Sequence, residues 1–257
     1  MKNRIITAVL GIPLLLCIMY LGGIYLKVLV ALLVFLGLFE FSRFFQTKVF
    51  WDYLVIAGLS FLILAYIGLH DSHFALWFYF QLFYYLLRVL LSGEKPVEHG
   101  WHLFTVFYVV GLFSFIWLIR DKFGFQWLLF GLLVTWATDT GAFYTGMRHG
   151  KHKLAPTISP KKTIEGALGG LVFAVITGLI FAGFTGYKLW PLGILALFLS
   201  IMGQIGDLVE SAIKRERQVK DSGKILPGHG GILDRFDSIL FVAPSLYFVL
   251  DFILNIA

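Results

Sequence analysis

The sequence predicts an all-α polytopic membrane protein with about nine transmembrane helices. Of its 257 residues, 59% are hydrophobic and only 14% are charged, whereas soluble domains are roughly 45–50% apolar and about 25% charged. The mean hydropathy is +0.85. The apolar stretches are continuous rather than alternating, which argues against a β-barrel. The composition also excludes a nucleic-acid-binding module, and the single cysteine, Cys17, excludes an internal disulfide.

Nine stretches are apolar enough to cross a bilayer, which takes about 20 residues. They cover residues 4–22, 24–42, 51–69, 73–92, 102–119, 124–146, 164–186, 190–212 and 238–256. The first could be mistaken for a signal peptide, but eight more follow it, so we expect it to be retained. We find no linker, low-complexity tract or convincing repeat. The sequence therefore predicts a single integral-membrane domain over 1–257, with N-terminal spans at about 4–119 and a C-terminal part at about 124–257.

The basic residues predict a cytoplasmic N-terminus. With nine spans and the N-terminus inside, 17 of the 21 Lys and Arg residues fall on the cytoplasmic side. The other four are Lys27, Arg120, Lys122 and Lys188. Because cytoplasmic loops carry an excess of Lys and Arg, this split supports the predicted topology. It also places two long loops, at about 147–163 and 213–237, in the cytoplasm.

The predicted helix at 190–212 carries a polar stripe at its cytoplasmic end. At 100° per residue, five polar side chains fall within about 120° of the helix circumference. They are Gln204, Asp207, Glu210, Ser211 and Lys214. Hydrogen bonds between helices are one explanation, but two carboxylates and a lysine exceed what such bonds need. In the helix at 124–146, Asp139 is either a snorkelling side chain or part of a polar cavity, since a buried carboxylate costs about 3 kcal/mol in a bilayer.

The densest polar segment of the chain runs from Ser211 to Asp237. It alternates bases with carboxylates around the glycine-rich turn Pro227-Gly228-His229-Gly230-Gly231, where the backbone can approach a ligand closely. Carboxylates from different helices suit a hard cation, because Mg²⁺ is typically held by one or two carboxylates together with substrate phosphates. No His-x-x-x-His or Cys-x-x-Cys pair indicates zinc. We expect four other histidines in interfacial loops: His70, His73, His99 and His102.

The loop at 147–163 ends in a second basic cluster. Ser159-Pro160 is typical of a helix N-cap followed by proline at the first helical position, which would place Lys161 and Lys162 in the first turn. The helix dipole disfavours cations there, unless an anion binds at the helix N-terminus. The alternative is an ordinary positively charged cytoplasmic loop. Three glycines that follow predict close helix packing: Gly166, Gly169 and Gly170.

These two segments resemble the signature of the phosphatidate cytidylyltransferases, also called CDP-diacylglycerol synthases. The first segment matches at about fifteen positions without a gap, in the pattern Ser211-x2-Lys214-Arg215-x4-Lys220-Asp221-x-Gly223-x2-Leu226-Pro227-x-His229-Gly230-Gly231-x2-Asp234-Arg235-x-Asp237. The second block is similar in Asp139-x2-Ala142-x3-Gly146 and in Gly150-Lys151-x-Lys153-Leu154-Ala155-Pro156-x2-Ser159-Pro160-x-Lys162-Thr163-x-Glu165-Gly166. Before residue 130, only length and hydropathy agree with the family.

The resemblance implies an enzyme of phospholipid biosynthesis, a nucleotidyltransferase that converts CTP and phosphatidic acid to CDP-diacylglycerol and pyrophosphate. It also implies dependence on Mg²⁺ or another divalent cation, with a second metal ion as an option, and a homodimer surrounded by membrane lipids. Nucleic acid is not an expected partner. We expect the protein in a bacterial-type inner membrane with its active site, in the part at about 124–257, facing the cytoplasm.

The matched positions imply roles for individual residues. The expected metal ligands are Asp207 and Asp234, with Asp139 as a further one. The expected catalytic residues are Lys220, Asp221, Arg235 and Asp237, in which the two aspartates either orient the bases or add to the metal ligands. The expected substrate-binding residues are Ser159, Lys162, Thr163, Ser211, Lys214, Arg215, His229 and Gly230.

Three other functions remain open at this point. A related enzyme could use another lipid phosphate or another nucleotide, because hydropathy does not discriminate lipid tails. An ion-coupled transporter or channel would place charges near mid-membrane in several spans, whereas here they gather at the cytoplasmic ends. A scaffold or lipid-binding protein would not need the complete acidic set.

Overall fold

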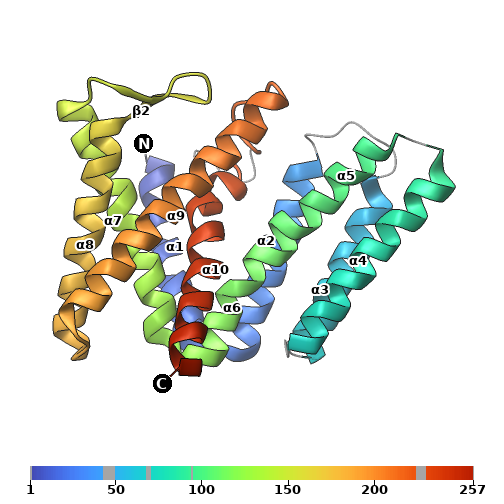
Figure 1. Cartoon of the computed structure of the whole chain (residues 1–257), viewed down its shortest axis with the longest axis horizontal. Coiled ribbons are helices and arrows are strands. Elements are labelled where there is room, and N and C mark those ends of the chain that lie inside the picture. The colour runs from blue at the N-terminus through green and yellow to red at the C-terminus, as the bar shows by residue number, and fades with distance from the viewer. Residues whose placement is uncertain (1, 43–49, 68–70, 94, 224–229, 257) are drawn as a thin grey trace.

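The computed structural model describes residues 2–42, 50–67, 71–93, 95–223 and 230–256, which form a helical bundle with one small β-hairpin at its end (Figure 1). The first half contains α1 (Lys2–Leu21), α2 (Gly23–Ser42), α3 (Phe50–Ile67), α4 (Asp71–Ser92) and α5 (Pro96–Thr105), which continues through a π-helical segment (Val106–Gly111) into α6 (Leu112–Phe123). The second half contains α7 (Phe125–His149), β1 (Lys153–Ala155), β2 (Ser159–Thr163), α8 (Ile164–Thr185), α9 (Leu189–Glu216) and α10 (Leu233–Ile256).

Within the described residues, each of the nine apolar stretches is helical over all but its ends. In the described part of the chain, four helical stretches are long and apolar enough to cross a membrane by length and composition: Gly23–Ser42, His99–Phe123, Ile164–Thr185 and Leu189–Glu216. Large apolar side chains such as Phe184 on α8 and Leu90 on α4 are exposed, as expected of a surface that contacts lipid. The predicted class, an all-α membrane protein, is confirmed; the number of spans stays a prediction.

Helices α7 and α8 pack closely because glycines line their contact. Gly141 of α7 and Gly169 and Gly170 of α8 are buried. A Cβ atom at Gly170 would lie 3.0 Å from the carbonyl oxygen of Thr138, and one at Gly169 would overlap the side chain of Thr145. The prediction of close packing at these glycines is confirmed. This contact fixes the part of α7 that carries the polar residues described below.

The segment before α8 is a β-hairpin, and our prediction of a helix start at Ser159 was wrong. Strands β1 and β2 pair in an antiparallel register, with Lys153 opposite Thr163 and Ala155 opposite Ser159. The helix begins only after Thr163, whose hydroxyl accepts the N–H of Gly166 at 3.1 Å. Lys161 and Lys162 therefore lie in a strand and not in the first helical turn.

Contacts from two helices hold the hairpin, which explains why its residues do not join α8. The Glu165 carboxylate, in the first turn of α8, accepts the backbone N–H groups of Lys151 at 3.0 Å and His152 at 3.2 Å. From α9, the Arg215 side chain donates to the carbonyl oxygen of Ile158 at 3.1 Å. Proline fits an edge strand as well as a first helical turn, so local sequence did not discriminate between them.

The histidines of α5 are core residues, so the expectation of interfacial loops was wrong for His99 and His102. Both are buried. The Tyr53 hydroxyl hydrogen-bonds the Nδ1 atom of His99 at 2.9 Å, and the Tyr53 ring stacks on His102 with the centroids 4.6 Å apart. His73 lies in α4, and His70 lies outside the described residues. Helices α3 and α5 are thereby joined by a polar aromatic contact.

Replacing Gly169 by alanine should loosen the contact between α7 and α8. The new methyl group would overlap the Thr145 side chain, and overpacking of this kind costs about 1–3 kcal/mol. We expect a lower melting temperature of the detergent-purified protein.

Gly183→Ala is the matched control in the same helix. No atom lies within 4 Å of its new methyl group, so the melting temperature should stay unchanged or rise slightly, because alanine favours helix over glycine. Equal melting temperatures for the two variants would contradict the close packing at Gly169.

Candidate active site

A cavity of about 620 Å³ lies where the C-terminal half of α7, the hairpin, α8, α9 and the start of α10 meet. Its charged lining residues are Asp139, Lys161, Lys162, Asp207, Asp234, Arg235 and Asp237. Its uncharged polar lining residues are Thr138, Thr163, Gln204 and Ser238, and apolar ones include Phe143, Met147 and Leu154. Acids and bases from separate segments of the sequence therefore share one cavity.

Three carboxylates from three helices face this cavity. Asp139 of α7, Asp207 of α9 and Asp237 of α10 all line it, and Asp234 of α10 adds a fourth carboxylate. The approach of α9 to α10 requires Gly206, because a Cβ atom there would lie 2.6 Å from the carbonyl oxygen of Asp237. The Lys162 ammonium lies 2.6 Å from Asp207 and offsets part of this negative charge. The cavity thus concentrates acidic oxygens beside a base from the hairpin.

The polar stripe of α9 divides between the cavity and the bundle interior. Gln204 donates to the carbonyl oxygen of Ala167 at 3.3 Å, an interhelical hydrogen bond to α8. Ser211 donates to Asp207 at 3.4 Å. Glu210 is 1% exposed and pairs with Lys214 at 3.2 Å, one turn along the helix. The predicted inward face is therefore confirmed, and part of it serves helix packing.

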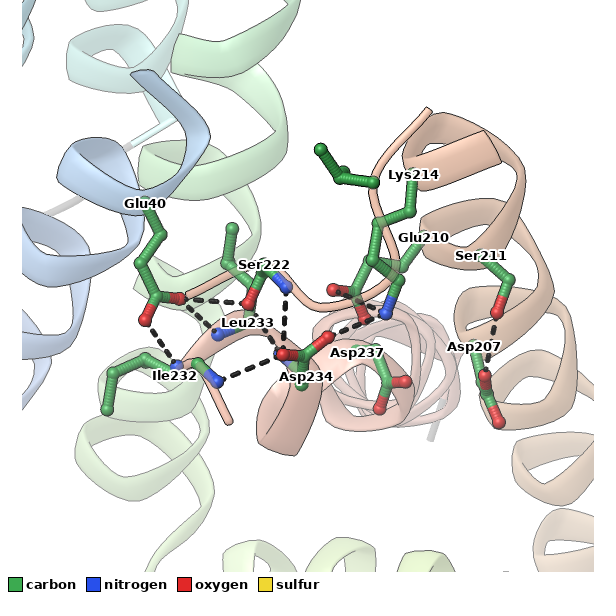
Figure 2. Close-up of polar contacts among 12 residues, drawn as sticks. Glu40, Asp207, Glu210, Ser211, Lys214, Ser222, Ile232, Leu233, Asp234 and Asp237 are labelled. Carbon is green, nitrogen blue, oxygen red and sulfur yellow. Dashed lines mark hydrogen bonds and ion pairs between the residues drawn. The ribbon is translucent and has the colours of Figure 1, made fainter. Parts of the chain in front are cut away.

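Asp234 is held by hydrogen bonds from three directions (Figure 2). One carboxylate oxygen, Oδ1, accepts a hydrogen bond from the Lys214 ammonium nitrogen at 2.6 Å. The other accepts the backbone N–H groups of Ser222 and Gly231, each at 2.9 Å. Asp234 therefore ties the segment after α9 to the first turn of α10 and fixes the place of Lys214 as well.

Sequence reasoning missed Glu40, a carboxylate of α2 that is 0% exposed. It accepts the N–H groups of Ile232 at 2.8 Å and Leu233 at 3.0 Å, and the Ser222 hydroxyl at 3.1 Å. The signal was present in the sequence, because Glu40 is the one acid in α2, a helix that is apolar apart from Lys27 and Ser42, and an ionisable residue in such a helix indicates function. It went unnoticed because nothing local connects it to the signature segment.

The predicted site residues fall into three groups in the structure. Those that line the cavity are Asp139, Lys162, Thr163, Asp207, Asp234, Arg235 and Asp237. Ser211 and Lys214 lie behind them and hydrogen-bond Asp207 and Asp234. The others that the structure describes are not among the lining residues: Ser159, Arg215, Lys220, Asp221 and Gly230.

The residues of the third group have other surroundings. Arg215 donates to backbone carbonyl oxygens of the hairpin and of Val219. Lys220 and Asp221 are exposed. Gly230 has φ +86°, a conformation that favours glycine, and lies against Asp234. His229 lies outside the described residues. Their predicted catalytic and binding roles stay predictions.

The donor chemistry of the cavity fits a divalent cation that also contacts substrate. No group of three or more His, Cys, Asp or Glu side chains forms a complete metal cage in the described ranges. Mg²⁺ does not need one, because one or two carboxylates and substrate phosphates suffice. Asp139, Asp207 and Asp237 offer such oxygens on the cavity wall. Asp234 uses both of its oxygens in hydrogen bonds, so less of its acceptor capacity is left for a cation.

Comparison with known proteins identifies the family. The family model described as "Cytidylyltransferase family" matches residues 2–253. The chain belongs to this family. It is 38% identical over 258 residues to a phosphatidate cytidylyltransferase of Staphylococcus saprophyticus, covering 97% of this chain and 99% of the relative. It is also 38% identical over 266 residues to a phosphatidate cytidylyltransferase of Bacillus subtilis, covering 97% of each chain.

Membership of the cytidylyltransferase family confirms the resemblance found in the signature and extends it to the N-terminal helices. It makes the chain a nucleotidyltransferase, as predicted, and removes the support for a transporter or a scaffold. The cavity supplies what this chemistry requires, because bases beside acidic oxygens can neutralise and align two anionic phosphates.

Removing the Lys162 ammonium should slow cytidylyl transfer. Lys162→Ala takes a base from the cavity and leaves Asp207 without its partner at 2.6 Å. We expect kcat/KM to fall about 10²-fold, the usual effect of losing one preorganised electrostatic contact. The measurement is steady-state transfer from labelled CTP to lipid.

Lys153→Ala is the matched control on the same hairpin. Lys153 is exposed and is not among the cavity-lining residues, so this variant should keep near-wild-type kcat/KM. Equal losses in the two variants would mean that the hairpin acts through its overall charge and not through Lys162.

Proposed function

We propose that this protein transfers the cytidylyl group of CTP to phosphatidic acid, giving CDP-diacylglycerol and pyrophosphate. The observation that carries the proposal is the cavity itself, where acids and bases of the signature meet apolar residues such as Phe143 and Met147. Phosphatidic acid has an anionic phosphate and two apolar chains, so it suits a cavity with both kinds of wall. The names of the two relatives support the same substrate.

In the proposed reaction, an oxygen of the phosphatidic acid phosphate attacks the α-phosphorus of CTP. A new phosphorus–oxygen bond forms, the bond from the α-phosphorus to the bridging oxygen of the β-phosphate breaks, and pyrophosphate leaves. Lys162 and Arg235 would hold the phosphates, with Thr163 and Ser211 as hydrogen-bond donors. The attacking phosphate oxygen is already ionised, so no strong general base is required.

We propose that Mg²⁺ or another divalent cation assists. When bound, it would neutralise phosphate charge, with Asp139, Asp207 and Asp237 as the residues that hold it. The role of Asp234 would be to position Lys214 and the first turn of α10, in addition to any contact with the cation. Lys220, Asp221 and His229 would complete the nucleotide side of the site.

We further propose nine spans, a cytoplasmic N-terminus and an active site that faces the cytoplasm of a bacterial inner membrane. Figure 1 supports this topology, because the N-terminus lies at the hairpin end of the bundle and the C-terminus at the opposite end. The excess of basic residues on the hairpin side supports the same orientation. The signature resemblance supports a homodimer, which the mass of the purified protein in detergent would test.

The reaction is tested with purified protein in mixed micelles. We expect labelled CTP and phosphatidic acid to give a CDP-lipid and pyrophosphate only when a divalent cation is present. CTP binding without product would instead indicate a different lipid phosphate as acceptor. No CTP binding by the folded protein would contradict the proposal.

Asp207→Asn and Asp234→Asn should each abolish turnover while the protein still inserts. The first removes a carboxylate from the cavity wall, and the second weakens the contacts that hold Lys214. Lys27→Ala is the control, because Lys27 pairs with Asp121 at 3.8 Å, away from the cavity-lining residues. Near-normal activity of either asparagine variant would show that turnover does not require that aspartate and would contradict its proposed role. A large loss in Lys27→Ala would contradict the topology.

Cysteine labelling tests the orientation. With Cys17, the single cysteine, replaced by serine, Lys153→Cys on β1 and Lys188→Cys after α8 would lie on opposite sides of the membrane. A membrane-impermeant maleimide should label Lys188→Cys in intact spheroplasts, and Lys153→Cys only after permeabilisation. The reverse pattern would overturn the proposed orientation.

A further inference from the structure

The Glu40 carboxylate links the N-terminal helices to the signature segment (Figure 2). Glu40 and Ser222 lie 182 positions apart in the chain, yet the Ser222 hydroxyl donates to Glu40 at 3.1 Å. The N–H groups of Ile232 and Leu233 donate to its two oxygens at 2.8 Å and 3.0 Å. Glu40 thus receives hydrogen bonds from both sides of residues 224–229.

Burial makes these hydrogen bonds necessary. Glu40 is 0% exposed, and a buried carboxylate is strongly unfavourable unless it is paired or hydrogen-bonded. Glu40 is not a partner in any of the ion pairs between described residues. Its donors are the hydroxyl of Ser222 and the N–H groups of Ile232 and Leu233 at the N-terminus of α10, where the helix dipole favours a negative charge. The carboxylate is therefore satisfied only when this segment and α10 take the observed places.

The hydrogen bonds continue from Glu40 to the cavity. The Ser222 hydroxyl, which donates to Glu40, also accepts the N–H of Asp234 at 3.3 Å. The backbone N–H of Ser222 in turn donates to the Asp234 carboxylate at 2.9 Å, and that carboxylate accepts the Lys214 ammonium at 2.6 Å. One continuous chain of contacts therefore runs from α2 through Ser222 to a residue of the cavity wall.

Two signature glycines pack directly against Glu40. A Cβ atom at Gly223 would lie 2.5 Å from one oxygen of the Glu40 carboxylate, and one at Gly231 would lie 2.6 Å from the other. Any larger residue at these positions would push the carboxylate from its donors. This close approach accounts for the glycine at both positions.

We propose that Glu40 is a positioning residue for cytidylyl transfer. It does not line the cavity, and it acts by holding Ser222 and the first turn of α10 so that Asp234 and Lys214 keep their places. This inference rests on the proposed function. It assigns a part of the active-site machinery to α2, in the half of the chain where the sequence showed only hydropathy.

A double-mutant cycle tests the proposal. Glu40→Gln keeps the shape of the side chain but loses the charge and one acceptor oxygen, and Ser222→Ala removes the hydroxyl link. We expect Glu40→Gln to lower kcat/KM about 10- to 100-fold, as for residues that orient catalytic ligands. Because both residues act in one chain of contacts, kcat/KM of the double variant should be no lower than that of the less active single variant. Losses that multiply would show independent or general damage and would overturn the proposal.

Asp52→Asn is the matched control, an equivalent loss of charge in another N-terminal helix. Asp52 is exposed and pairs with Arg88 at 3.4 Å, so its variant should keep wild-type activity. Activity of the wild-type protein in the same assay establishes the proposed function on its own. With an active wild type, a Glu40→Gln variant of equal kcat/KM would overturn only the role of Glu40.

A second variant tests the same contact without removing the buried acid. Gly223→Ala would place a methyl group against the Glu40 carboxylate and should reproduce the loss of activity, even if Glu40→Gln fails to insert. Gly58→Ala in α3 is its control, because nothing lies within 4 Å of the new methyl group. Wild-type kcat/KM in Gly223→Ala would contradict the proposal.

Discussion

The Lys214 ammonium lies 2.6 Å from Asp234 and 3.2 Å from Glu210 and joins α9 to α10. Glu210 is 1% exposed, and removing one partner of a buried ion pair costs about 3–5 kcal/mol. The two helices therefore have a strongly preferred relative position, in which Lys214 forms an ion pair with both carboxylates. The same contact brings Asp207, one turn before Glu210, towards Asp237, one turn after Asp234. The acidic wall of the cavity follows from this arrangement.

The opposite wall of the cavity depends on close packing rather than on charge. Gly169 and Gly170 let α8 approach α7, and the hairpin between these helices reaches the cavity with Lys162. The hairpin is held by Glu165 of α8 and Arg215 of α9. A base from a strand thus meets acids from helices, and residues that do not line the cavity, such as Lys214, Glu165 and Arg215, hold the residues that do.

Local patterns in the sequence predicted more of the helices than of the loops between them. Apolar length placed the nine helical regions, and the 100° periodicity placed Asp207 and Lys214 on one inward face, because both signals depend on residues near in the chain. The hairpin was missed, since Ser159-Pro160 suits a helix start and a strand equally. Its strand conformation depends on pairing with residues 153–155 and on contacts from α8 and α9.

Composition, periodicity and an ungapped motif were enough to predict the membrane class, the family and most of the charged residues that line the cavity, because these signals do not depend on contacts between distant residues. The contacts that each of these residues makes came only from the folded structure. In the structure, Asp207 pairs with Lys162, and Asp234 accepts hydrogen bonds from Lys214 and from backbone N–H groups. The fold also brings Glu40 to the signature segment across 182 positions. A contact at that separation leaves no periodicity in a single sequence, since it arises only when a buried charge must find its donors.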